Sequence, residues 1–116
     1  MKIKTSNLTG PALDYVVAKC EGIEFWAAEN PRDGFFFDRD RTMRFSPPTN
    51  WAQGGPIIER EVGNYYQDSV GEYYAHNKAG THLGKGPTPL IAAMRCFVAS
   101  RLGDEVDIPE ELNAAR

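Results

Sequence analysis

The chain has 116 residues, of which 41% are hydrophobic and 25% are charged, and this composition is typical of a globular fold rather than a disordered chain. Its formal net charge of −3 argues against broad binding to DNA or RNA, which needs many Lys and Arg side chains to neutralise phosphates. A local basic pocket is compatible with this charge. We therefore expect a single domain over residues 1–116 for which nucleic acid is not the main partner.

The sequence also argues against a membrane protein and against a bound metal. The longest apolar run is far shorter than the ~20 residues that span a bilayer, and residues 1–5 lack the apolar core of a signal peptide. Cys20 and Cys96 have no Cys or His neighbour at zinc-ligand spacing, so we interpret both as free thiols in a protein of the reducing cytoplasm.

The first predicted elements are a short edge strand and a helix. Polar and apolar residues alternate over residues 2–6, as in a strand at a sheet edge. Thr9 and Pro11 are typical of a helix start, and Gly22 of a helix end. These signals predict a helix over residues 10–21. Its apolar face has the spacing i, i+3, i+4, i+7 and consists of Leu13, Val16, Val17 and Cys20.

The next stretch favours a hairpin followed by irregular chain. Residues 23–27 and 35–37 are rich in aromatic and β-branched side chains, and turn-forming residues separate them at positions 30–34. Residues 50–56 predict a loop or a broken helical turn. From Pro56 to Arg60 the sequence fits either a short helix or a strand.

The second half of the chain predicts one strand, a glycine-rich loop and a second helix. Residues 70–75 favour a strand, and residues 78–87 favour a loop because they show no periodicity. A helix over residues 89–102 follows, with Thr88 at its start and Gly103 after its end. Its apolar face consists of Leu90, Ile91, Met94, Phe97 and Val98.

Two amphipathic helices need an apolar surface to cover. The sequence therefore predicts an α+β fold in which two amphipathic helices pack on a small, mostly antiparallel sheet of about three to five strands, both on the same face.

The glycine-rich loop that leads into the second helix is a candidate anion site. Free N–H groups and the positive end of the helix dipole would lie behind Gly86 and Thr88, while Lys85 adds a cation. The pattern is not a Walker motif, because Ala79 and Gly86 occupy positions that need Gly and Ser or Thr. A plain surface loop before a well-capped helix is the alternative.

A second candidate is the segment of residues 51–56. Trp51 could stack on a flat ring, Gln53 could form hydrogen bonds, and Gly54 and Gly55 would let the backbone approach a ligand. The alternative is a core tryptophan beside a tight turn. We predict that this segment and residues 84–89 lie side by side and line one pocket.

Three more polar residues, Arg95, His76 and His82, could bind a ligand or a metal ion or act in catalysis. Arg95 lies at the edge of the second apolar stripe, so it should either pair with a carboxylate or point into a ligand site. His76 and His82 lack further metal ligands and a nucleophile partner. We therefore predict no metal, no cofactor and no catalytic residue, and favour a binding protein over an enzyme.

Three blocks of the sequence resemble the NinX-like proteins of lambda-like tailed phages. The first is Met-Lys-Ile-Lys-Thr at 1–5, continuing to Ala-Lys-Cys-Glu-Gly at 18–22. The second is Asn-Trp-Ala-Gln-Gly-Gly-Pro-Ile-Ile-Glu-Arg at 50–60. The third is Gly-Pro-Thr-Pro-Leu-Ile-Ala-Ala-Met-Arg at 86–95, continuing to Ile-Pro-Glu-Glu-Leu at 108–112. This resemblance implies a non-structural protein made in the cytoplasm of an infected bacterium, and it supplies no catalytic residues.

Three hypotheses for function remain open. The first is a binder of a phosphate-bearing nucleotide, for which sequestering a signal of host defence is one role. The second is an adaptor or inhibitor of a replication factor, using the aromatic residues 65–74 as an interface. The third is a small nucleotide hydrolase with His76 or His82 as acid or base. For any of these, a homodimer or higher homo-oligomer is expected.

Overall fold

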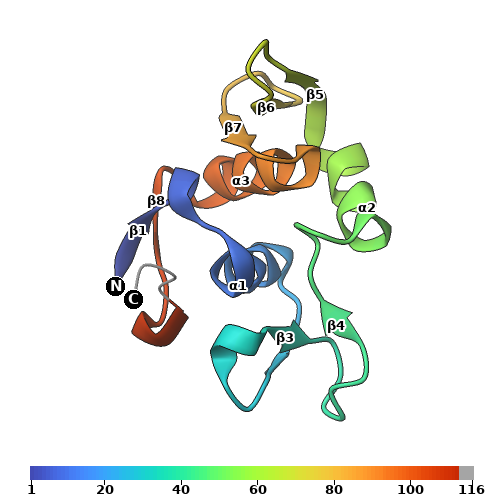
Figure 1. Cartoon of the computed structure of the whole chain (residues 1–116), viewed down its shortest axis with the longest axis vertical. Helices are drawn as coiled ribbons and strands as arrows, with labels where there is room; N and C mark the ends of the chain where they lie inside the picture. Colours follow the sequence, from blue (N-terminus) through green and yellow to red (C-terminus); the bar gives the residue numbers. More distant parts are fainter. Residues whose placement is uncertain (113–116) are drawn as a thin grey trace.

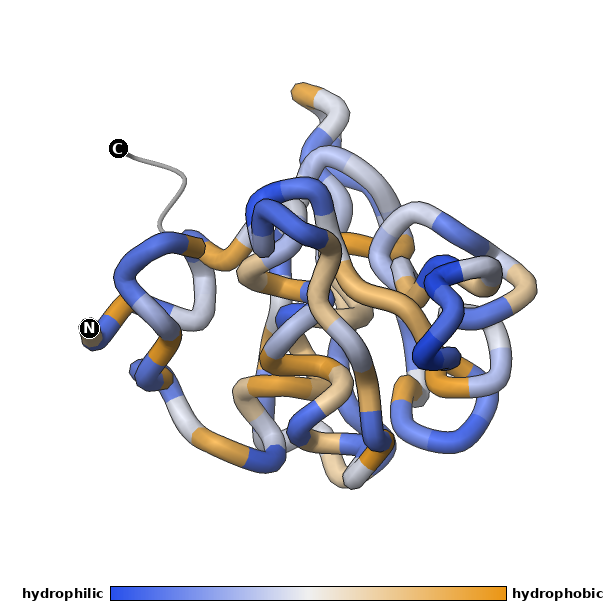
Figure 2. Tube along the Cα trace, turned by 90° about the horizontal axis from the view of Figure 1, so that it is seen from below, coloured by the Kyte–Doolittle hydropathy of each residue, from blue (hydrophilic) through white to orange (hydrophobic). Residues whose placement is uncertain are grey.

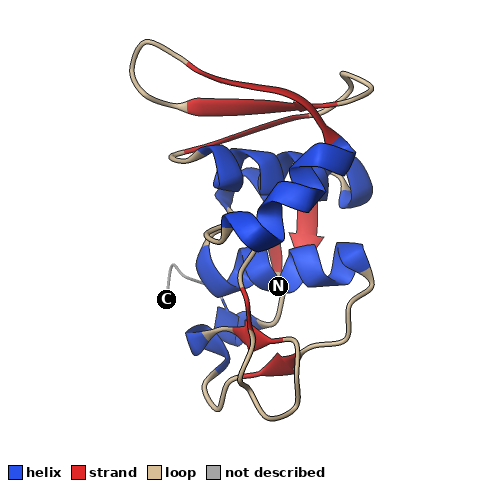
Figure 3. Ribbon diagram, turned by 90° about the vertical axis from the view of Figure 1, so that its right-hand side faces the viewer, coloured by secondary structure: helices blue, strands red, loops and turns tan. Residues whose placement is uncertain are grey.

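The computed structural model describes residues 1–112, and its centre is the helix α3 (Pro89–Leu102). A three-stranded sheet covers one side of α3, and α1 (Gly10–Glu21) and α2 (Trp51–Glu61) lie against its other sides (Figure 1). Figure 3 shows the layers from the side, with helices between a longer and a shorter sheet. The buried hydrophobic side chains of the described residues form one cluster that extends through these layers.

All the strand pairs in the described part of the chain are antiparallel, which confirms the α+β class. The single sheet that we expected is instead divided into three small sheets. The prediction that both helices lie on the same face of one sheet is also wrong. The sheet of β5, β6 and β7 packs on α3, whereas α1 packs on α3 itself and on β3. The sheets are β1 (Lys2–Lys4) with β8 (Glu105–Asp107); β2 (Trp26–Ala27), β3 (Phe35–Phe36) and β4 (Arg44–Phe45); and β5 (Val62–Gln67), β6 (Tyr73–Asn77) and β7 (Leu83–Gly86).

Two short 3₁₀ turns connect these elements, Thr5–Asn7 and Pro31–Asp33, and a third, Glu110–Leu112, follows β8. The predicted hairpin of residues 23–37 is present, with β2 pairing to β3 around the turn at Pro31–Asp33. Figure 2 shows hydrophobic residues on helical turns near the centre of the trace and hydrophilic residues in many outer loops.

Helix α1 has the predicted bounds, and Leu13, Val16 and Val17 are buried as expected, while Cys20 is half-buried. It ends at Gly22, whose φ of 67° lies in the left-handed region that glycine adopts without strain. Thr9 occupies the position before the first turn, but its side chain forms no capping hydrogen bond, contrary to the prediction.

Helix α3 also has the predicted bounds. The hydroxyl oxygen of Thr88 accepts a hydrogen bond from the backbone N–H of Ile91 at 3.1 Å, so this cap forms as expected. The helix is buried on more than the predicted stripe, and Cys96, which lies off that stripe, is as inaccessible as Phe97. The extra burial arises because the sheet and α1 cover opposite sides of α3.

Of the two alternatives expected at residues 50–56, the loop is wrong and the helical turn is nearer the structure, since a continuous helix, α2, begins at Trp51. The side-chain oxygen of Asn50 caps the helix by accepting a hydrogen bond from the N–H of Ala52 at 2.9 Å. A Cβ atom on Gly54 would lie 2.5 Å from the backbone oxygen of Pro47 and from Leu90, so glycine permits close packing at this position. Pro56 is tolerated inside the helix at the cost of one backbone hydrogen bond.

The loop expected at residues 78–87 contains strand β7. A Cβ atom on Gly84 would lie 2.2 Å from the backbone oxygen of Ala92 on α3, and one on Gly86 would lie 2.8 Å from the Ile91 side chain. These two glycines therefore let β7 pack against the backbone of α3. Their role in packing explains the glycine-rich composition, which in the sequence alone suggests close approach of a ligand.

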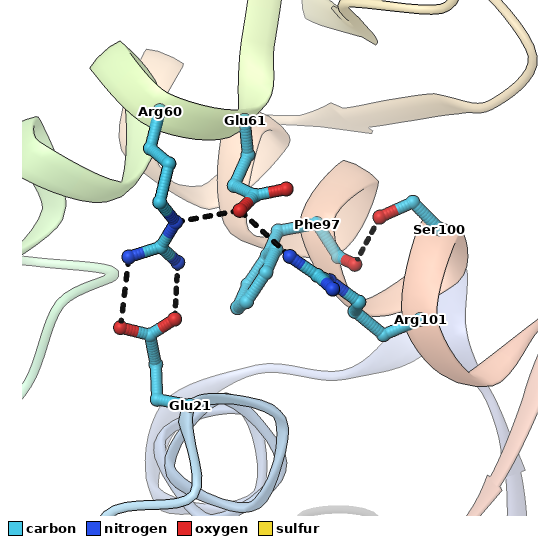
Figure 4. Close-up of polar contacts among 6 residues, drawn as sticks. All are labelled: Glu21, Arg60, Glu61, Phe97, Ser100 and Arg101. Atoms are coloured by element: carbon cyan, nitrogen blue, oxygen red, sulfur yellow. Dashed lines mark hydrogen bonds and ion pairs between the residues drawn. The ribbon is translucent and has the colours of Figure 1, made fainter.

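Charged residues join the C-terminal ends of all three helices (Figure 4). Glu21 ends α1 and forms an ion pair with Arg60 near the end of α2. Glu61 accepts hydrogen bonds from Arg60 at 2.6 Å and from Arg101 of α3 at 2.7 Å. The Arg60 and Arg101 guanidinium groups also lie 5.6 and 5.3 Å from the centre of the Phe97 ring. We call these four charged residues the C-terminal ion-pair cluster.

Candidate functional site: a groove at three helix N-termini

The N-terminal ends of the same three helices line one groove. It consists of two adjoining hollows of about 230 and 280 Å³, which share Pro48, Thr49 and Ile91. We call it the N-terminal groove. The first hollow is also lined by Trp51, Thr88, Pro89 and Leu90, and the second by Thr9, Gly10, Pro11, Asp14, Arg44 and Ser46.

Each helix contributes its positive end to this groove. Gly10 and Trp51 are the first residues of α1 and α2, and Thr88 precedes the first residue of α3. First-turn N–H groups lack partners within a helix, and the helix dipole places partial positive charge there. The side chains of Asn50 and Thr88 cap α2 and α3, whereas the side chain of Thr9 leaves the first turn of α1 uncapped. The groove is therefore suited to an anion.

Arg44 and Asp14 are the two charged residues that line the groove. The backbone of Arg44 belongs to β4, and one of its guanidinium N–H groups donates to the carbonyl oxygen of Asp33 at 2.5 Å. Asp14 is on α1 and only 6% of its surface is exposed. Its carboxyl group forms no hydrogen bond or ion pair with any residue that the structure describes.

Burial has a large effect on the Asp14 carboxyl group. Desolvation raises its pKa from 3.8 to about 7, and the positive charge of Arg44 opposes this shift. At neutral pH the group therefore exchanges between an acid that donates a hydrogen bond and a carboxylate that only accepts them. No described side-chain oxygen is both sealed from solvent and unbonded, so the carboxyl oxygens of Asp14 remain accessible from the groove, where a ligand group can reach them.

Trp51 is the exposed aromatic residue of the groove. Its side chain is 52% exposed, so it is not the core tryptophan that the alternative interpretation required. Thr88 and Trp51 line the same hollow, which places one residue from each of the two predicted site segments together. The segments meet through helix N-termini rather than through two loops.

Gln53, Gly54 and Gly55 do not face a ligand in the predicted manner. The Gln53 amide accepts a hydrogen bond from the N–H of Ser46 and donates one to the carbonyl of Arg44, both at 2.6 Å. It therefore fixes the chain between β4 and α2 along the groove. The N–H of Gly54 donates to the carbonyl of Asn50 at 2.8 Å, so the helix uses it, and Gly55 is a helical residue beside open space.

Lys85 and Arg95 lie on a different hollow, with a volume of about 720 Å³. Arg95 donates hydrogen bonds to the carbonyl oxygens of Leu8 and Lys85, each at 2.8 Å, so of its two expected roles the pairing with a carboxylate is not formed. This hollow is larger than the N-terminal groove. Acidic and basic residues both line it, so its charge does not favour an anion over a cation. Its charged residues are Lys4, Lys85, Arg95, Asp104 and Glu105.

A comparison with protein families identifies the family of the chain. The family model described as Bacteriophage P22, NinX matches residues 4–101. The chain belongs to this NinX family. The resemblance found in the sequence is thereby confirmed, and the match includes every residue that lines the N-terminal groove. A search of curated proteins found no significant match to this NinX protein.

The two charged residues of the groove, Asp14 and Arg44, were missed by sequence analysis. Asp14 directly follows Leu13 and precedes Val17 by one helical turn, so it borders the apolar face of α1, and this position was a detectable signal. Arg44 gave no such signal, because it reaches the groove only through the pairing of β3 with β4. His76 and His82, in contrast, do not line the groove.

Within residues 1–112 of this NinX protein, no helix is long and apolar enough to cross a membrane. The same residues contain no group of three or more His, Cys, Asp or Glu side chains arranged to hold a metal ion.

Proposed function

We propose that this NinX protein binds a small phosphate-bearing nucleotide in the N-terminal groove. The observation that supports this most directly is that three helix N-termini and Arg44 line one groove beside a half-exposed tryptophan. A phosphate group would interact with the helix ends and with the guanidinium group. A base would stack on Trp51, an interaction of ~1–3 kcal/mol per base.

The biological part of the proposal concerns the infected bacterium. A phage protein that binds a nucleotide without converting it can lower the free concentration of that nucleotide, and we propose that it sequesters a signal of host defence in the host cytoplasm. We also propose that it acts as a homodimer or higher homo-oligomer, since in small proteins a second subunit often forms part of the binding pocket.

A panel of nucleotides tests the proposal. Thermal denaturation with mono-, di- and triphosphates and with cyclic nucleotides should show a rise in Tm for at least one compound, because a ligand that binds only the folded state stabilises it. Mass spectrometry of small molecules released from protein purified out of infected cells would identify the natural ligand. Mass spectrometry of the bound nucleotide after incubation distinguishes binding from hydrolysis.

Two variants assign binding to the groove. Trp51→Ala and Arg44→Gln should each weaken nucleotide binding about tenfold or more, since stacking and a charge-assisted hydrogen bond are lost. Tyr65→Ala and Arg39→Ala are the matched controls, because both side chains are exposed and neither lines the groove. If no nucleotide changes the Tm, or if the controls weaken binding as much as the groove variants, the proposal fails.

A second candidate function is a protein interface on the sheet of β5, β6 and β7. Tyr66 stacks on Tyr74 with ring centres 5.4 Å apart and on His76 at 5.8 Å, and Tyr66 is 45% exposed. Exposed stacked aromatics are typical of interface anchors. Affinity capture from infected cells with wild type and with Tyr66→Ser would test this function, and only loss of a captured protein in the variant would support it.

A further inference from the structure

We propose that Asp14 binds the anionic ligand as a neutral carboxylic acid, donating its O–H to an oxygen of the anion and taking up one proton from solvent as the anion enters. This inference rests on the proposed function, because it assumes that the N-terminal groove receives an anion. It identifies Asp14 as a binding residue, and it defines the ligand group as one whose oxygens accept hydrogen bonds.

The first step is the position of the carboxyl group. Asp14 lines the same hollow as Thr9 and Gly10 at the start of α1, and it is 6% exposed. No hydrogen bond or ion pair joins its side chain to the rest of residues 1–112. A group that enters this hollow can therefore supply the missing partner without displacing one.

The second step is the charge around Asp14. Arg44 from β4 is the one other charged residue that lines the groove, while the segment between β4 and α2 contributes Ser46 and Thr49, and α3 contributes Ile91. The helix ends add partial positive charge but no group that titrates. When an anion occupies the groove, an ionised Asp14 would place a second negative charge beside it at a poorly solvated site. Protonating Asp14 removes this repulsion and creates a hydrogen-bond donor.

The third step is the proton balance. One proton moves from solvent to a carboxylate oxygen of Asp14, the O–H formed then donates to the anion, and no other covalent bond changes. Burial already raises the pKa of Asp14 to about 7, so at neutral pH the proton is taken up at small cost. A ligand with an N–H or ammonium group beside Asp14 would favour the ionised form and release a proton instead.

Sulfate is the suitable probe, because it accepts hydrogen bonds like phosphate and does not titrate between about pH 5 and 9. Wild-type affinity for sulfate should be nearly constant below about pH 7 and fall about tenfold for each pH unit above it, since binding then requires one proton. Calorimetry at about pH 8 in two buffers with different ionisation enthalpies should give close to one proton taken up per sulfate bound.

Asp14→Asn provides the decisive variant. Its amide donates a hydrogen bond at every pH, so sulfate affinity should become independent of pH and exceed that of wild type above about pH 8. Asp40→Asn is the control, because Asp40 is exposed and outside the groove, and it should keep the pH dependence of wild type. If Asp14→Asn does not fold, the two-buffer measurement on wild type still decides the question.

The outcomes separate this inference from the proposed function. If wild type binds neither sulfate nor nucleotides at any pH, the groove is not an anion site and the proposed function fails as well. If they bind with no proton uptake, or if Asp14→Asn keeps the full pH dependence, the groove binds anions but Asp14 does not act as their donor. Release of a proton on binding would also overturn the inference.

Discussion

A Cβ atom on Gly84 of β7 would lie only 2.3 Å from the backbone nitrogen of Cys96 on α3. This distance is far below van der Waals contact, and both partners are backbone or directly attached to it, so a side-chain rotation cannot relieve the overlap. The sheet of β5, β6 and β7 therefore sits on α3 at a separation that only glycine permits at this position.

Gly84→Ala should destabilise the protein by about 3 kcal/mol or more, because β7 must move away from α3 and open the core. Urea denaturation followed by circular dichroism would measure the loss. Gly55→Ala is the matched control, since nothing lies within 4 Å of its Cβ position and the residue is helical. It should stabilise the protein by up to roughly 1 kcal/mol, and equal effects of the two variants would contradict this account.

Stability should depend on pH through Asp14. Its pKa is raised from 3.8 to about 7 by burial, so between these values the folded state keeps a proton that the unfolded state has lost. The contribution of Asp14 to stability is therefore complete below about pH 4, declines as pH rises to about 7, and then stays constant. The total decline should be a few kcal/mol.

Urea denaturation at about pH 4, 5.5 and 7.5 would measure this decline as a change in the free energy of unfolding. Asp14→Asn should remove most of it, because the amide does not titrate. Asp40→Asn, which changes an exposed carboxylate, should show the same pH dependence as wild type. If the free energy of unfolding of wild type instead rises with pH over this range, another titrating group dominates the pH dependence of stability.

The C-terminal ion-pair cluster should contribute modestly to stability. Arg60→Ala removes the contacts to Glu21 and Glu61 and the packing over Phe97, but the Arg60 side chain is 48% exposed and solvent screens its charge. We expect a loss of about 1 kcal/mol that shrinks in high salt. Arg39→Ala, with an exposed side chain, should change the free energy of unfolding by less than half as much.

Both cysteines should react slowly with alkylating reagents. Burial raises the pKa of Cys20 and of Cys96 to about 11, so few thiolates exist at neutral pH. Cys96 is 1% exposed and Cys20 is half-buried, so mass spectrometry after iodoacetamide treatment should find Cys20 modified first. Rapid modification of Cys96 in the folded protein would mean that α3 opens more easily than its packing indicates.

The sequence by itself determined the elements whose signals are local. The bounds of α1 and α3, the glycine after α1 and the Thr88 cap all depend on hydrogen bonds between residues a few positions apart, and the apolar periodicity identified which sides are buried. The β2–β3 hairpin is equally local, because a short turn brings its strands together. The family resemblance also came from contiguous blocks of sequence.

Tertiary structure alone decided what the glycines and charged residues do. In the sequence, Gly54, Gly84 and Gly86 suggest that a ligand approaches the backbone. In the structure, a residue of another element lies within a few ångströms of the Cβ position of each, so close packing favours glycine there. Lys85 and Trp51 were expected on one site and lie on two, because β7 directs Lys85 toward β1 and β8. Asp14 and Arg44 line the same hollow only because α1 packs beside β3, which in turn pairs with β4. Such long-range packing is a property of the folded chain and not of any local pattern.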